Sequence, residues 1–164
     1  MPDLWRELRD LFDTDDGSLP EVHITNLSSA DVPKGYEFIR AHSEIVTERP
    51  YFWSLSEQQE VSLDSVPNAA ALVVRGDAEA FHCVFRVTVD GTPIPDLGVF
   101  VTPDSLLLDY RMGPEWNEAA LTAFLRLLRE LTRCAPGAKV SLEPWVIDDV
   151  QDRFRLAWER FRGA

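Results

Sequence analysis

The sequence predicts an α+β protein, a two-layer domain in which a mainly antiparallel β-sheet carries helices on one face. Two observations lead to this prediction. The stretch Leu97–Cys134 holds two short apolar runs separated by the turn sequence TPDS, and a long amphipathic segment follows them. Residues 80–89 alternate between apolar and polar side chains, which is the period of a half-buried strand. Because no linker or repeat divides the chain, we expect residues 1–164 to form a single domain.

The chain is expected to begin with a short helix, a strand and a second helix. The first helix is indicated by an apolar stripe that consists of Leu4, Trp5, Leu8, Leu11 and Phe12. Glu21–Leu27 alternates and predicts a strand. Ser28 to Asp31 offer capping side chains for a helix that runs to His42, with Pro33 in its first turn.

The segment Glu44–Asn68 has no clear period, and its main feature is a run of three aromatic residues. Tyr51, Phe52 and Trp53 cannot all point into one core from a strand, because neighbouring side chains of a strand point to opposite faces. A loop that buries two of these rings against the sheet is one interpretation. The other is an aromatic anchor for a binding partner.

A four-stranded meander is predicted for the centre of the sheet. Its strands are Ala70–Arg75, Ala80–Val89, 97–101 and 106–110. Gly76 and Asp77 would form its first turn. One or two further strands are expected from Glu21–Leu27 and Lys139–Leu142.

Two amphipathic helices are predicted after the meander. The apolar stripe of the first consists of Ala120, Phe124, Leu127, Leu128 and Leu131. The stripe of the second consists of Ile147, Val150, Phe154, Ala157, Trp158 and Phe161. Asn117 is a suitable cap for the first helix, and Pro136-Gly137 ends it.

The hairpin between residues 97 and 110 separates two faces of the sheet. A tight loop at Pro103-Asp104 pairs Leu97 with Tyr110 and Val99 with Leu108, which gives a uniformly apolar face that the two C-terminal helices can cover. The reverse face, here named the outer sheet face, would carry His82, Val84, Arg86, Phe100, Leu107, Asp109 and Arg111. A loop with a bulge would exchange the two faces.

Phe100 and Leu107 would be wet if nothing covered the outer sheet face, so we expect at least partial cover. The sequence allows three alternatives for what covers this face. The first is another part of this chain, such as the N-terminal elements or residues 44–66. The second is another copy of the chain in a homodimer, and the third is a different partner.

A net charge of −12 is the strongest global signal. It disfavours nucleic acid and anionic membranes as partners, because both carry negative charge, and it favours a basic protein partner. The first ten residues are not a signal peptide, and no apolar run reaches the length of a membrane span. Cys83 and Cys134 are too few for a disulfide scaffold. We therefore expect a cytoplasmic protein.

Common catalytic and cofactor motifs are absent from the sequence, including the phosphate-binding loop, the dinucleotide fingerprint, the nucleophile elbow and the H-E-x-x-H zinc motif. We predict no metal site and no cofactor. A residual catalytic hypothesis places Asp109, His82 and either Arg86 or Arg111 in one pocket, where they could perform acid–base chemistry on an anionic substrate. Cross-strand ion pairs explain the same residues.

In size, charge and general architecture, this small acidic domain resembles bacterial immunity proteins and secretion chaperones. The resemblance implies a non-enzymatic module that binds a basic partner. The candidate contact residues are Tyr51, Phe52, Trp53, His82, Arg86, Phe100, Leu107, Asp109 and Arg111. The alternative is a small-molecule-binding protein or enzyme that uses a pocket formed by His82, Asp109 and Arg111.

Overall fold

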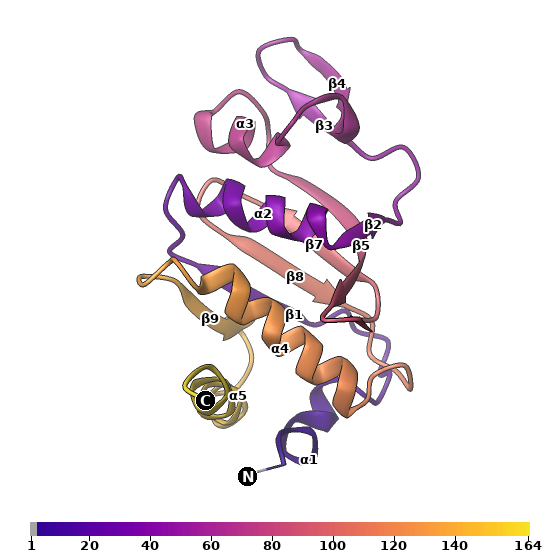
Figure 1. Ribbon diagram of the computed structural model, residues 1–164, viewed down its shortest axis with the longest axis vertical. Helices are drawn as coiled ribbons and strands as arrows, with labels where there is room; N and C mark the ends of the chain where they lie inside the picture. The colour runs from indigo at the N-terminus through magenta and orange to yellow at the C-terminus, as the bar shows by residue number, and fades with distance from the viewer. Residues whose placement is uncertain (1–2) are drawn as a thin grey trace.

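A seven-stranded antiparallel sheet with helices packed against it forms the frame of the protein (Figure 1). The computed structural model describes residues 3–164. In chain order, its elements are α1 (Leu4–Leu8), η1 (Arg9–Leu11), β1 (Glu21–Thr25), α2 (Asp31–Ala41), β2 (Ser43–Ile45), β3 (Tyr51–Ser54), β4 (Gln59–Ser62), η2 (Leu63–Ser65), α3 (Ala69–Arg75), β5 (Phe81–Val89), β6 (Thr92–Pro93), β7 (Leu97–Val101), β8 (Leu106–Tyr110), α4 (Glu118–Thr132), β9 (Lys139–Leu142) and α5 (Asp148–Arg162).

The α+β class with its antiparallel sheet is confirmed. The strand order is β2-β5-β7-β8-β1-β9, with the short β6 paired to β5, and a separate hairpin is formed by β3 and β4. Helices α2 and α4 lie side by side across one face of the sheet, as Figure 1 shows. The two C-terminal helices were expected to cover this face; α4 lies across it, whereas α5 packs at its edge against β9, α1 and α4.

The register predicted for the central hairpin is correct. Leu97 lies opposite Tyr110, Val99 opposite Leu108, and Val101 opposite Leu106. All six side chains are buried, and they face the same side as the alternate residues of β5 and β1. The pattern of period two therefore determined which side chains form the core and which form the outer sheet face.

The prediction of a strand at Ala70–Arg75 is wrong, since these residues form helix α3. The helix has a cap at each end. The Asn68 side chain accepts from the backbone N–H of Ala71, and Gly76 ends the helix in the left-handed region at φ 82°. These caps and the helix-forming alanines outweigh the apolar run that suggested a strand.

The segment Glu44–Asn68 is more regular than the sequence suggested. It contains the end of β2, the β3–β4 hairpin and a turn of 3-10 helix. Tyr51, Phe52 and Trp53 are the first residues of strand β3, so their side chains alternate. Phe52 is 1% exposed and contacts Phe81, whereas Tyr51 and Trp53 are 53% and 37% exposed. The interpretation of a loop that buries two rings is therefore wrong, because Tyr51 and Trp53 share the exposed face of the strand and only Phe52 points into the core.

Candidate functional site

The outer sheet face is open in its middle. His82, Phe100, Leu107 and His23 lie directly opposite one another on β5, β7, β8 and β1. Phe100 is 36% exposed and the His82 side chain 46% exposed, while Leu107 and His23 are half-buried. The helices of residues 3–164 thus leave an apolar centre on this face accessible to water. Such a face is unusual for a surface that contacts only solvent.

His82 and Asp109 form a close pair that bridges a strand. The imidazole Nε2 lies 2.6 Å from Asp109 Oδ2, although His82 belongs to β5 and Asp109 to β8, with β7 between them. Gly98 of β7 makes this bridge possible. A Cβ atom at Gly98 would overlap both carboxylate oxygens of Asp109 and Nε2 of His82. The missing side chain therefore creates the space in which the pair lies.

The pair has a clear electrostatic consequence. The hydrogen bond to Asp109 raises the pKa of His82 above its ordinary value, although partial burial of the imidazole opposes this shift. The charges of Asp109 and Glu21 add to the increase. His82 therefore holds its proton to higher pH than a free histidine does.

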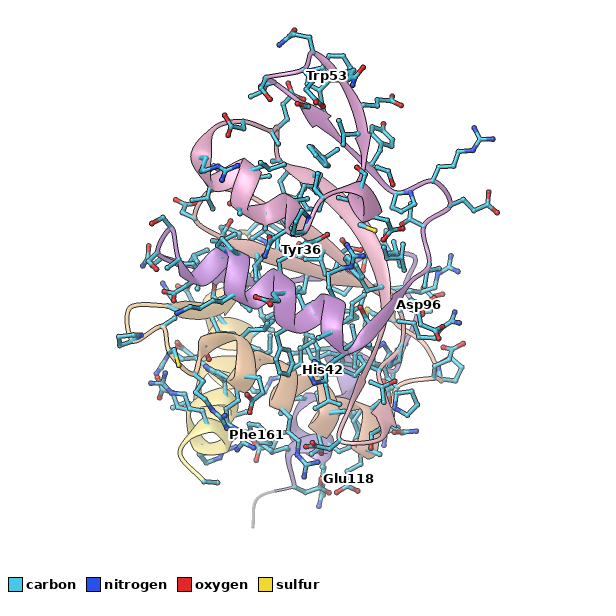
Figure 2. All side chains as sticks on the ribbon, turned by 45° about the horizontal axis from the view of Figure 1, so that its top comes forward. Tyr36, His42, Trp53, Asp96, Glu118 and Phe161 are labelled. Atoms are coloured by element: carbon cyan, nitrogen blue, oxygen red, sulfur yellow. The ribbon has the colours of Figure 1, made fainter. Side chains whose placement is uncertain are left out.

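The two arginines of the catalytic hypothesis do not join this pair in an ion pair. Arg86 Nε lies 3.1 Å from Asp96 Oδ1, at the side of the molecule where Figure 2 labels Asp96. Arg111 is exposed and follows the last residue of β8. Of the residues in the catalytic hypothesis, the structure brings together His82 and Asp109, whereas Arg86 forms an ion pair with Asp96.

Acids outnumber bases around the outer sheet face. From the strand register and the ion pairs, the acids are Glu21, Glu44, Asp96 and Asp109. The bases are Arg86, Lys139 and the exposed Arg111, so the acids exceed the bases by one. His23 lies 3.1 Å from Glu21, so the two histidines of the face each have a carboxylate neighbour. The local charge has the same sign as the net charge of the whole chain.

An open groove of about 450 Å³ lies between β3 and the start of β5, and we name it the β3–β5 groove. Its lining residues are Thr47, Tyr51, Phe52, Trp53, Glu60, Glu79, Ala80, Phe81 and His82. The groove joins the two predicted contact regions, because His82 belongs both to its lining and to the outer sheet face. Figure 2 shows Trp53 on the hairpin, at the end of the molecule opposite to Glu118 and Phe161.

Sequence reasoning missed Gly98, Glu60 and Glu79 as members of this region. Gly98 had a detectable signal, since a glycine inside a strand indicates a close approach of other groups. Glu60 and Glu79 had none, because their position beside Trp53 and His82 depends on the path of the segment between β2 and β5.

Other classes of site were also considered. Among residues 3–164, no group of three or more His, Cys, Asp or Glu side chains is arranged to hold a metal ion. Over the same residues, no helix combines the length and apolar character that crossing a bilayer requires. The sequence matches no protein-family model, and searches of curated proteins and of solved structures find no match either. The function must therefore be argued from the site alone.

Proposed function

We propose that this protein is a non-enzymatic acidic interaction module that binds a basic partner protein through the outer sheet face and the adjoining β3–β5 groove. The supporting observation is that the helices leave this face open while its centre carries the exposed ring of Phe100. Tyr51 and Trp53 add two exposed rings in the adjoining groove, which His82 links to Phe100. Exposed apolar rings with charged groups around them are typical of protein-binding surfaces.

The charge distribution favours a basic partner over a second copy of this chain. Two copies of this chain repel each other, because each carries a net charge of −12. A basic partner is instead attracted and steered by the same net charge. The same charge opposes nucleic acid and anionic membranes.

The proposal includes a cytoplasmic location and a role of the kind that bacterial immunity proteins and secretion chaperones perform. The location is supported by two free cysteines, of which Cys134 is exposed and Cys83 is buried. Exposed thiols are more common in reducing compartments.

The test is the binding of a fluorescent hexa-arginine peptide, followed by anisotropy, to three forms of the protein. Glu60→Gln/Glu79→Gln should weaken binding by about fivefold or more, because each exposed charge pair contributes up to about 1 kcal/mol. Glu37→Gln/Glu115→Gln removes the same charge from exposed positions outside the groove lining and should change binding by less than about twofold. Equal weakening in both variants would mean that binding depends only on the net charge of the protein, which would contradict the proposal.

A second candidate function is a small-molecule-binding protein or enzyme that uses His82 and Asp109 with Arg111. The observation that favours it is the 2.6 Å pair over Gly98, since an imidazole held by a carboxylate is a common acid–base unit. A thermal-shift screen against small carboxylates and phosphates would detect such a ligand, and Asp109→Ala should abolish the response. If no compound shifts the melting temperature, the interaction module is the better supported function.

A further inference from the structure

The β3–β5 groove begins where two strands separate. Ser54 at the end of β3 forms an antiparallel bridge with Ala78, and the N–H of Glu79 donates to the carbonyl of Trp53 at 3.0 Å. Beyond Glu79 the chain continues into β5 and the main sheet, whereas β3 remains in the separate hairpin. The groove therefore lies between the edges of two strands that no longer pair with each other.

One wall of the groove is the edge of β5. Along β5, Val84 turns its backbone groups toward β2, because its carbonyl accepts from Val46 N–H at 2.8 Å and its N–H donates to Thr47 Oγ1 at 2.9 Å. His82, two residues earlier, has the same orientation. Strand β2 pairs only with residues 85–87, so in residues 3–164 no strand covers this side of His82. Its carbonyl and N–H thus face the groove.

The opposite wall is the edge of β3. Trp53 directs its carbonyl away from β4, toward Glu79. Tyr51 has the same orientation two residues earlier, so its backbone carbonyl and N–H also face the groove. Phe52 differs, because it lies opposite Val61 and its ring is buried against Phe81. The groove thus has hydrogen-bonding backbone groups on two sides.

The rim of the groove combines carboxylates with aromatic rings. Glu60 lies directly opposite Trp53 in the hairpin, so the two side chains share a face. Glu79 follows the bridge to β3. Nearby acids have basic neighbours, as in the pairs Arg40–Asp64 and Arg75–Asp77. Within residues 3–164, by contrast, Glu60 and Glu79 have no basic side chain within ion-pair distance.

From this arrangement we propose that the β3–β5 groove receives one arginine side chain of the basic partner. The inference rests on the proposed function and names the group that the groove recognises. The guanidinium would stack on the exposed rings of Trp53 or Tyr51, pair with Glu79 and Glu60, and donate to the outward backbone carbonyls. Asp109 holds the His82 imidazole on the outer sheet face, so the groove keeps its own carboxylates for the ligand.

Arginine fits this groove better than lysine does. A guanidinium is planar and has five donors in fixed directions, which matches acceptors placed on two walls together with a flat ring. An ammonium group is compact and strongly hydrated, so it gains less from stacking and from dispersed acceptors. The neutral isostere citrulline has nearly the same shape but lacks the charge that Glu60 and Glu79 require.

The test uses three small probes on the intact protein, namely the Nα-acetyl amides of arginine, lysine and citrulline. Binding is followed by NMR on the indole N–H of Trp53 and on the backbone amides of Tyr51 and His82. We expect saturable shifts with the arginine probe, affinity about threefold weaker for lysine, and about tenfold weaker for citrulline. Trp53→Ala should weaken arginine binding by about fivefold, and Glu79→Gln by about threefold. Glu37→Gln should leave it unchanged.

Two results would overturn the inference. Equal binding of arginine and citrulline would exclude charge recognition, and equal effects of Glu79→Gln and Glu37→Gln would exclude the groove as the site. In either case, the hexa-arginine peptide could still bind Glu60→Gln/Glu79→Gln more weakly than Glu37→Gln/Glu115→Gln. The proposed function would then be supported, and the inference that the groove receives a single arginine side chain would be wrong. If the peptide bound the two double variants equally, both the proposed function and the arginine inference would be wrong.

Discussion

At the scale of single residues, the candidate site depends on Gly98. The absent side chain lets His82 and Asp109 meet across β7, and no other residue type leaves that space. His82 and Asp109 were predicted to share a face because the alternation of β5 and β8 fixes their direction. Their contact was not predictable, because it joins two strands that are not neighbours.

Replacement of Gly98 by alanine should separate the pair. The pKa of His82 should then fall toward its ordinary value, because the hydrogen bond to Asp109 is its main cause of increase. We expect the free energy of unfolding to change by less than about 1 kcal/mol, since alanine restricts the unfolded chain and offsets the loss of an exposed pair. An NMR titration of the His82 imidazole measures the pKa. An unchanged pKa in the variant would show that the pair does not need the space at Gly98.

The pair should also make stability depend on pH. A histidine whose pKa is raised by folding stabilises the native state below the ordinary pKa of about 6.5, and this contribution is lost as pH rises through the raised value. The wild type should therefore exceed His82→Gln in stability at about pH 5.5, by at most about 1 kcal/mol because His82 is half exposed, and the difference should vanish near pH 9. Urea unfolding at both pH values checks this. A difference that grew with pH would contradict it.

At the scale of elements, the β3–β4 hairpin positions the groove and is held to the rest of the protein by the buried ring of Phe52 and by backbone hydrogen bonds to Asp77 and Glu79. The sequence identified the aromatic run but not the hairpin, because β4 is polar and its residues show no burial pattern. Helix α3 was misassigned for a related reason. A short apolar run such as Ala69–Val74 fits a strand or a helix equally well, and only its caps Asn68 and Gly76 decide the outcome.

Phe52→Ala should destabilise the protein by about 3–5 kcal/mol, because a fully buried ring is removed from its contact with Phe81. The neighbouring change Tyr51→Ala is the matched control, since this ring is 53% exposed, and it should alter stability by less than about 0.5 kcal/mol. Both are measured by urea unfolding. Similar effects at the two positions would mean that the alternation of burial in β3 is incorrect.

At the scale of the whole molecule, shape and charge act together. The helices cover one face of the sheet, and the open face carries the same negative sign as the chain overall. The two faces were predictable from the hairpin register, whereas the position of α2 beside α4 and of α5 at the β9 edge was not. Helix amphipathicity shows that a helix packs, but it does not show on which part of the sheet.

The charge of the outer sheet face predicts a monomer in the absence of a partner. Light scattering at micromolar concentration should give the mass of one chain, 18.6 kDa, at both low and moderate salt. A stable dimer that the substitution Phe100→Asp converts to monomers would instead show that the open face binds a second copy of this chain.

The most direct test of the account is a map of backbone NMR shifts on addition of the hexa-arginine peptide. We predict that the perturbed amides lie in β3, β4 and the first half of β5, extend to Phe100 on the outer sheet face, and return toward their free positions as salt is raised. Shifts spread evenly over all acidic surfaces, or concentrated on the exposed sides of α2 and α4, would contradict the central claim that the open face and its groove form the partner site.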